Sequence, residues 1–214
     1  MQVKQFTVNH FEENCYLVID DDTKKCAIID PGMLAQYELD GVDDYISTQK
    51  LIPVMVLLTH PHVDHLAGLQ HVCDKYNLPV SMHKDGEKML KQADAYGSVM
   101  GFDIAPIQNL KVNYIDEGTI LELGKGKIEC RAVPGHCVGS MAFVLHEEKM
   151  VITGDALFRG SIGRTDLPGG DFDQLMRSIK ERLLVLDDDY SVLPGHGDCS
   201  TIGDERHNPF INFE

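Results

Sequence analysis

The sequence predicts an α/β fold in which two β-sheets pack face to face and helices cover their outer surfaces. Strand and helix patterns alternate through both halves of the 214-residue chain. A continuous apolar run at residues 53–59 is typical of a strand buried on both faces. No Gly/Ser linker divides the sequence, and one α/β unit of this length is ordinary. We therefore expect a single domain that spans residues 1–214.

Three strand-like runs open the chain at residues 3–8, 15–20 and 25–30, and the Pro31-Gly32 pair closes the third. They predict an antiparallel meander. Apolar residues at helical spacing predict helices over residues 37–49, 65–76 and 86–96. A short strand is expected at residues 79–83. Residues 97–109 have a mixed pattern and are expected to form a loop that borders the pocket.

Strand patterns return in the second half at residues 111–115, 120–123, 127–133, 141–145, 149–153 and 190–193. The last clear helix is expected to begin at Asp171, where Gln174 completes a capping-box-like start. An apolar stripe between residues 175 and 184 then gives this helix a buried face.

Composition and charge exclude several classes of partner. The formal net charge is −15, which would repel nucleic-acid phosphates and anionic membranes. No apolar run approaches the ~20 residues of a membrane-spanning helix. Residues 1–6 do not follow the pattern of a signal peptide. We expect a cytoplasmic protein that acts on a small molecule, with no nucleic-acid or membrane partner.

Cysteine usage gives no sign of a disulfide framework. The six cysteines are scattered without a CxxC pair. In a cytoplasmic protein of this size they are expected to be reduced and packed.

Four short stretches contain residues that commonly bind metals: THPHVDH at residues 59–65, PGH at 134–136, GD at 154–155 and PGHG at 194–197. Imidazole and carboxylate ligands leave an ion Lewis-acidic, whereas thiolates neutralise it. The set therefore predicts a hydrolytic site for two divalent metal ions, with Zn²⁺ expected and Fe or Mn as alternatives. The candidate ligands are His60, His62, Asp64, His65, His136, Asp155 and His196.

The 60–65 segment can bind two neighbouring ions. Side chains two residues apart in an extended segment point to the same side, so His60 and His62 can reach one ion. Asp64 and His65 come from the next bend and face an adjacent position. Such a density of ligand-type residues directly after a buried strand favours metal binding over ordinary packing.

Two more histidines and one carboxylate complete the predicted centre. His136 and His196 come from distant parts of the sequence and are expected to complete one ion each. Two cations placed close together repel each other, so a carboxylate is needed between them. Asp155 is the candidate bridge.

These four motifs resemble the metallo-β-lactamase superfamily, and within it the glyoxalase II-like branch. The segments GSIGRTD at residues 160–166 and ERHNPF at 205–210 are similar to short bacterial hydrolases of the hydroxyacylglutathione hydrolase type. The resemblance spans most of the chain and implies a four-layer αβ/βα sandwich with metal ligands on loops along one edge. It also implies that one ion is bound by His60, His62 and His136, that the second is bound by Asp64, His65 and His196, and that Asp155 bridges them.

The sequence departs from full-length glyoxalase II enzymes in two places. Those enzymes carry a further helical domain that supplies basic residues for glutathione, whereas this chain ends soon after the His196 motif. Cys137 follows a candidate ligand where the family commonly has a hydroxyl residue. We expect Cys137 to be a packed thiol, and redox sensitivity beside a metal is the alternative.

The function expected from the donor set and the resemblance is thioester hydrolysis, with a hydroxyacyl thioester as the model substrate. A hydroxide that bridges two ions would be available near neutral pH, because metal binding lowers the pKa of water from ~15.7 to ~7. Asp64 is expected to act both as a ligand and as the catalytic residue that orients this nucleophile. Arg164 is the candidate for binding a substrate carboxylate, with a surface salt bridge as the alternative.

A persulfide dioxygenase with one Fe(II) is the alternative enzyme. His60, His136 and Asp155 alone form a two-His-one-carboxylate set, which supports oxygen chemistry. Persulfide dioxygenases resemble this chain in that respect and in the Gly-Arg-Thr-Asp run at residues 163–166. The other four candidate ligands are also present, which favours the hydrolase. A nuclease is disfavoured by the acidic charge, and a secreted β-lactamase by the absence of an export signal.

Overall fold

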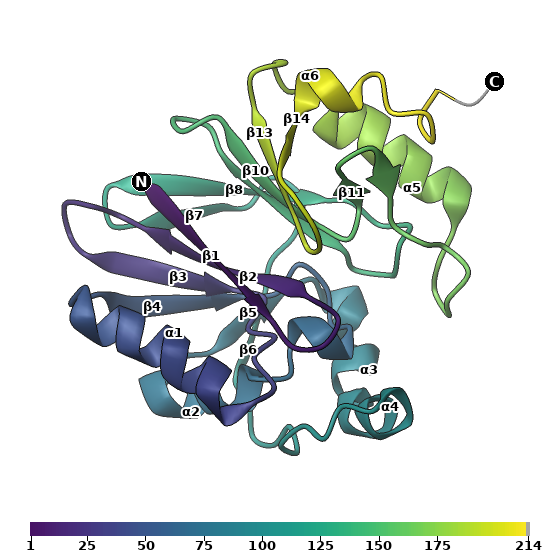
Figure 1. Ribbon diagram of the computed structural model, residues 1–214. Helices are drawn as coiled ribbons and strands as arrows, with labels where there is room; N and C mark the ends of the chain where they lie inside the picture. The colour runs from purple at the N-terminus through teal and green to yellow at the C-terminus, as the bar shows by residue number, and fades with distance from the viewer. Residues whose placement is uncertain (213–214) are drawn as a thin grey trace.

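The computed structural model describes residues 1–212 of the chain. Two six-stranded sheets pack face to face, and helices cover their outer faces (Figure 1). The predicted α/β class and the four-layer αβ/βα arrangement are therefore confirmed.

The first sheet has the strand order β1-β2-β3-β4-β5-β6. Strands β1 (Gln2–Val8), β2 (Glu13–Ile19) and β3 (Lys25–Ile29) form the predicted antiparallel meander. Strands β4 (Ile52–Leu57), β5 (Val80–Met82) and β6 (Val112–Tyr114) continue the sheet in parallel with β3. Because β3 and β4 are parallel, the loops that follow them leave the sheet at the same edge.

The second sheet has the order β14-β13-β10-β9-β8-β7. Its strands are β7 (Ile120–Leu123), β8 (Gly126–Ala132), β9 (Met141–Leu145), β10 (Met150–Gly154), β13 (Ser191–Pro194) and β14 (Ser200–Thr201). Strands β10 and β13 pair in parallel, with Gly154 opposite Pro194, so the residues that follow them also leave at one edge. A small hairpin of β11 (Leu157–Phe158) and β12 (Ser161–Ile162) follows β10.

Helices α1 (Gln36–Thr48) and α2 (Leu69–Tyr76) lie against the first sheet, and α5 (Phe172–Ser178) and α6 (Ile202–Glu205) lie beside the second (Figure 1). A π-helical turn, Ile179–Leu183, extends α5. The short helices α3 (Glu87–Leu90) and α4 (Ala93–Met100) follow β5. Within residues 1–212, no helix is both long enough and apolar enough to cross a membrane.

The strands at the centre of the sandwich are buried on both faces. Along β2, Cys15, Leu17 and Ile19 belong to the hydrophobic cluster on the α1 and α2 side. Tyr16 and Val18, which alternate with them, belong to the cluster between the two sheets. This alternation is the two-residue period of a strand, and it explains why every residue of β2 is buried.

Three local predictions differ from the structure. Only the end of β4, Val56 and Leu57, is fully buried, whereas Ile52 at its start is exposed. The helix predicted over residues 65–76 begins at Leu69 instead, after a separate 3₁₀ turn at Val63–His65. The helix predicted over residues 86–96 is divided into α3 and α4, and α4 continues until Gly101 ends it with a φ of +81°.

The structure also makes Cys137 a packed thiol. All six cysteines are free, and every one except Cys199 is buried. The Cys137 Sγ lies 3.3 Å from the Ser140 hydroxyl oxygen. Burial raises the pKa of the Cys137 thiol to about 12, so little of the reactive thiolate is present at neutral pH.

We expect a water-soluble disulfide reagent to modify one thiol, Cys199, in the native protein and all six thiols after denaturation. Counting the released chromophore checks this. A Cys199→Ser variant should lose the fast phase, and a fast-reacting thiol that persists in this variant would contradict the packing described for Cys137.

Candidate metal centre

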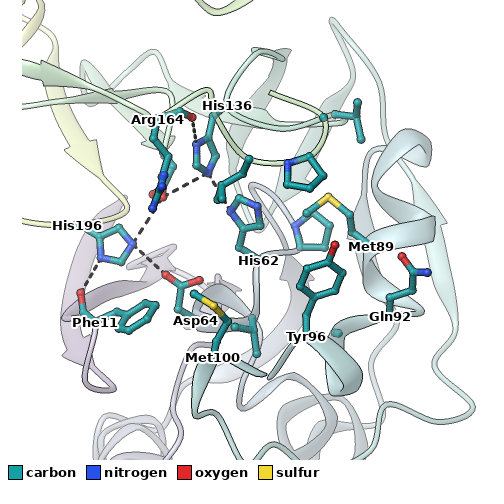
Figure 2. A pocket seen from close by; sticks show the side chains of 18 of the residues that line it. Phe11, His62, Asp64, Met89, Gln92, Tyr96, Met100, His136, Arg164 and His196 are labelled. Carbon is teal, nitrogen blue, oxygen red and sulfur yellow. Dashed lines mark hydrogen bonds and ion pairs between the residues drawn. The ribbon is translucent and has the colours of Figure 1, made fainter. Parts of the chain in front are cut away.

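The structure brings the seven predicted metal ligands together at one edge of the sandwich. They lie on loops or turns that follow strands of both sheets. Figure 2 shows four of them, His62, Asp64, His136 and His196. His60 and His62 follow β4, and Asp64 and His65 lie in the 3₁₀ turn at Val63–His65. His136 follows β8, Asp155 follows β10 and His196 follows β13. The strand ends of the two sheets therefore build the centre jointly.

His60, His62 and His136 form the first of two clusters. The Nδ1 atom of His62 lies 3.0 Å from His60 Nε2 and 2.9 Å from His136 Nε2. The three ring nitrogens are close enough to bind one ion. This is the grouping that the sequence predicted for the first metal.

Asp64, His65 and His196 form the second cluster. The Oδ2 atom of Asp64 lies 3.2 Å from His196 Nε2 and 3.8 Å from His65 Nε2. These atoms are also close enough to bind one ion. The 3₁₀ turn, rather than the first turn of α2, directs Asp64 and His65 toward this position.

Asp155 lies between the two clusters. Its Oδ2 is 3.9 Å from His60 Nε2 and 3.6 Å from His136 Nε2. Its Oδ1 is 3.3 Å from His65 Nε2. Its Oδ2 is also 3.7 Å from His196 Nε2. The carboxylate thus reaches both clusters, as a bridging ligand requires.

Two buried atoms at this point lack a hydrogen-bond partner among the described residues: His65 Nε2 and Asp155 Oδ1. They face each other at 3.3 Å but are not aligned for a hydrogen bond. A buried polar atom without a partner costs about 1–3 kcal/mol. A cation between these atoms would satisfy both, so the residues present fit a metal pair.

The carboxylate of Asp30 holds two of the histidines in place. Its Oδ2 accepts a hydrogen bond from His65 Nδ1 at 3.0 Å and from the Thr59 hydroxyl at 2.6 Å. The same hydroxyl lies 3.0 Å from His60 Nδ1. These contacts place the ring proton of His60 and His65 on Nδ1, which leaves the Nε2 lone pair for an ion.

Main-chain carbonyl groups orient two further histidines. His136 Nδ1 lies 2.8 Å from the carbonyl oxygen of Arg164, and His196 Nδ1 lies 2.9 Å from that of Phe11. Both therefore present Nε2 to the centre. His62 differs, because its Nδ1 atom faces the other ring nitrogens.

Burial and neighbouring charges set the protonation of the donor groups. Burial by itself would lower the pKa of His65 and His196, but the carboxylates of Asp64 and Asp155 raise both above the usual value, so an ion that binds there must displace a proton. Burial lowers the pKa of His60 well below its usual value and that of His62 to about 4, with neighbouring histidines acting in the same direction. Both rings are therefore neutral at neutral pH. Burial by itself would raise the pKa of Asp155, but the charges of His65 and His136 hold it below its usual value.

Arg164 lies at the wall of the cavity beside the metal centre. Its Nε and Nη2 atoms each donate to a carboxylate oxygen of Asp166 at 2.8 Å. The guanidinium is thus held in the exposed salt bridge that the sequence left as the alternative. Its main-chain carbonyl has a separate role, since it orients His136. Binding of a substrate carboxylate by Arg164 remains a prediction.

Three residues around the centre were missed by the sequence reasoning: Phe11, Glu13 and Asp30. Glu13 is fully buried, and its Oε1 lies 3.7 Å from His65 Nδ1. Burial raises its pKa well above the usual value. Asp30 could have been found, because it directly follows a strand, as Asp155 does. Phe11 and Glu13 lie at the first turn of the meander, where the sequence carries no comparable signal.

A cavity of about 870 Å³ opens onto the centre. The candidate ligands His62, Asp64, His136 and His196 form its polar end (Figure 2), and Asp155 also lines it. A cavity of this size is typical of a small-molecule site.

Comparison with known proteins agrees with this architecture. The model of the Metallo-beta-lactamase superfamily matches residues 8–196. The chain is 36% identical to the probable metallo-hydrolase YqgX of Bacillus subtilis, over 99% of this chain and 98% of that protein. It is 35% identical to the hydroxyacylglutathione hydrolase GloC of Haemophilus influenzae, over 99% of both chains.

Solved structures give the same family. BLEG-1, described as a B3 metallo-β-lactamase, has a TM-score of 0.88 and 32% identity, covering 99% of this chain and 100% of that one. TTHA1623 in a di-iron-bound form has a TM-score of 0.85 and 35% identity, covering 96% of this chain and 98% of that one. ETHE1 from Myxococcus xanthus has a TM-score of 0.77 and 26% identity, covering 98% and 84%. The chain therefore belongs to the metallo-β-lactamase superfamily, as a metal-dependent hydrolase with a His/Asp cluster for a dinuclear centre.

Proposed function

We propose that the protein hydrolyses a small-molecule thioester in the cytoplasm with two divalent ions. The observation that carries this proposal is the position of Asp155, whose carboxylate lies within 3.9 Å of histidine nitrogens from both ligand clusters. Zinc is the expected ion, and the di-iron-bound form of TTHA1623 keeps iron as an alternative. The first ion would be held by His60, His62 and His136, the second by Asp64, His65 and His196, and both by Asp155.

Bound divalent ions would supply Lewis acidity that polarises the thioester carbonyl and acidifies water. Asp64 is 8% exposed and lines the cavity, so its carboxylate can accept a hydrogen bond from the attacking water and orient it. Water adds to the carbonyl carbon, the C–S bond breaks, and the departing thiolate takes up a proton. The resemblance to GloC, at 35% identity, supports a thioester as the substrate class.

The alternative function is persulfide oxidation at a single Fe(II). His60, His136 and Asp155 lie together at the first cluster, with Asp155 Oδ2 within 3.9 Å of both ring nitrogens. The structural likeness to ETHE1 is compatible with this alternative as well as with hydrolysis. The second cluster argues against a single-ion enzyme, since Asp64, His65 and His196 are also close enough to bind an ion.

Metal removal and reloading tests which chemistry the centre performs. We expect the chelator-treated protein to lose activity, and two equivalents of zinc to restore thioester hydrolysis. Metal analysis, a hydrolysis assay and persulfide-dependent oxygen uptake should be measured on the same preparations. One iron per chain with oxygen uptake and no hydrolysis would overturn the proposal.

Replacement of Asp64 by alanine should remove the second ion and reduce hydrolysis about 100-fold, the lower range for loss of a proton-handling residue. Asp85→Ala is the matched control, because Asp85 lines the same cavity but is exposed and lies outside both clusters. Bound metal and the rate kcat are the measurements. Unchanged turnover in Asp64→Ala would contradict the two-ion model.

Replacement of Asp30 by asparagine should lower metal affinity about 10- to 100-fold, as expected when a residue that orients ligands is changed. The carboxylate accepts on both oxygens: Oδ2 from the Thr59 hydroxyl and His65 Nδ1, and Oδ1 from the Thr59 main-chain N–H at 2.6 Å. An amide has one acceptor oxygen, so its NH₂ group would face a donor at one of these places. Competition with a chromophoric chelator measures the affinity, and circular dichroism checks the fold. Asp44→Asn, on the exposed face of α1, is the control. Equal affinity in a folded Asp30→Asn protein would show that Asp30 does not position the ligands.

A further inference from the structure

The cavity beside the metal centre is apolar away from the candidate ligands. Helices α3 and α4 supply Met89, Tyr96 and Met100 to one wall (Figure 2). Phe158 on β11 contributes further apolar surface, as do Val138 and Leu167 from the loops after β8 and β12. We call this part of the cavity, lined by these six residues, the apolar compartment.

Several of the apolar side chains around this compartment are exposed to solvent. Tyr96 is 51% exposed, Met100 48% and Val138 39%. A group of exposed apolar side chains beside a polar site marks a binding surface, because a ligand that covers them removes apolar area from water. The compartment is continuous with the ligand clusters, so a molecule bound at the centre extends into it.

Cationic side chains are few in this cavity. Among the described residues that line it, Lys88 and Arg164 are the lysine and arginine side chains present. The Arg164 guanidinium is already bound to Asp166 at 2.8 Å through two hydrogen bonds. Lys88 is exposed, and the exposed Asp85 lines the same cavity. The two carboxylates of glutathione would find few cationic side-chain partners here.

We propose that the substrate is a thioester with one apolar arm, aromatic or branched aliphatic, and that this arm occupies the apolar compartment. This inference rests on the proposed thioester hydrolysis and adds a substrate class to it. With the carbonyl at the metal centre, the arm packs against Met100 on α4 and Val138 on the opposite loop. The compartment then selects substrates by apolar surface, and the metal centre performs the chemistry.

Three thioesters test the proposal: a hydroxyacetyl thioester of glutathione, a 3-phenylpropanoyl thioester of glutathione, and a hydroxyacetyl thioester of benzyl mercaptan. We expect at least one of the two apolar-arm compounds to exceed the first by about tenfold or more in kcat/KM, the scale on which hydrophobic pockets discriminate. Which of the two apolar-arm compounds has the higher kcat/KM shows whether the acyl arm or the thiol arm occupies the compartment. If all three are hydrolysed and the first is equal or best, this inference is wrong and the proposed function stands. If none is hydrolysed, the proposed function itself fails, and this inference with it.

A matched pair of variants separates pocket binding from intrinsic reactivity. Met100→Lys places a charge in the compartment, whereas Val99→Lys places one on the same helix at a residue that is 81% exposed and outside the cavity lining. We expect Met100→Lys to lower kcat/KM for the preferred compound about tenfold while the glutathione hydroxyacetyl thioester changes less than about twofold. Val99→Lys should change neither.

Binding provides a readout that does not depend on turnover. A thioether with the same apolar arm cannot be hydrolysed, and its affinity for the metal-loaded protein can be measured by calorimetry. The affinity should fall about tenfold in Met100→Lys and remain unchanged in Val99→Lys. Equal affinity in the folded Met100→Lys protein and the wild type would overturn the proposal.

Discussion

The metal centre depends on one buried carboxylate that is not itself a candidate ligand, Asp30. It follows β3 with a left-handed φ of +49°, and the parallel pairing of β3 with β4 places it beside Thr59. From there it binds His65 directly and His60 through the Thr59 hydroxyl. One residue of each cluster is therefore oriented from the same point, so the two clusters keep a fixed relation to each other.

Strand direction brings the remaining ligands to that point. Strands β10 and β13 are parallel, so Asp155 and His196 leave the second sheet side by side. Hydrogen bonds connect the first sheet to these residues: Tyr16 and Asn14 on β2 donate to the carbonyl oxygen of Pro194 at 2.7 Å and 3.1 Å. These bonds join the two sheets close to the centre, and an error in the register of either sheet would separate the two clusters.

Much of this arrangement was predictable from the sequence, because the strand and ligand signals are local. The antiparallel meander and the buried period-two pattern of β2 lie in short runs, and the seven candidate ligands each follow a strand-like segment. What could not be predicted depends on contacts between distant segments. The start of α2 at Leu69 and the division between α3 and α4 were not expected. The sequence left the salt bridge of Arg164 as one of two alternatives and did not identify Asp166 as its partner. Asp30 was read only as the end of a strand, since its partners lie about thirty residues away or more.

Glu13 gives the centre a further property. Its carboxyl group is buried against His65 and has no hydrogen-bond partner within residues 1–212, and a carboxyl in that environment favours its neutral form. Gly32 makes room for this group, because a Cβ on residue 32 would lie 2.2 Å from Glu13 Oε2. A side chain there would therefore displace the carboxyl and disturb the His65 ring from its Nδ1 side, opposite to the candidate cations.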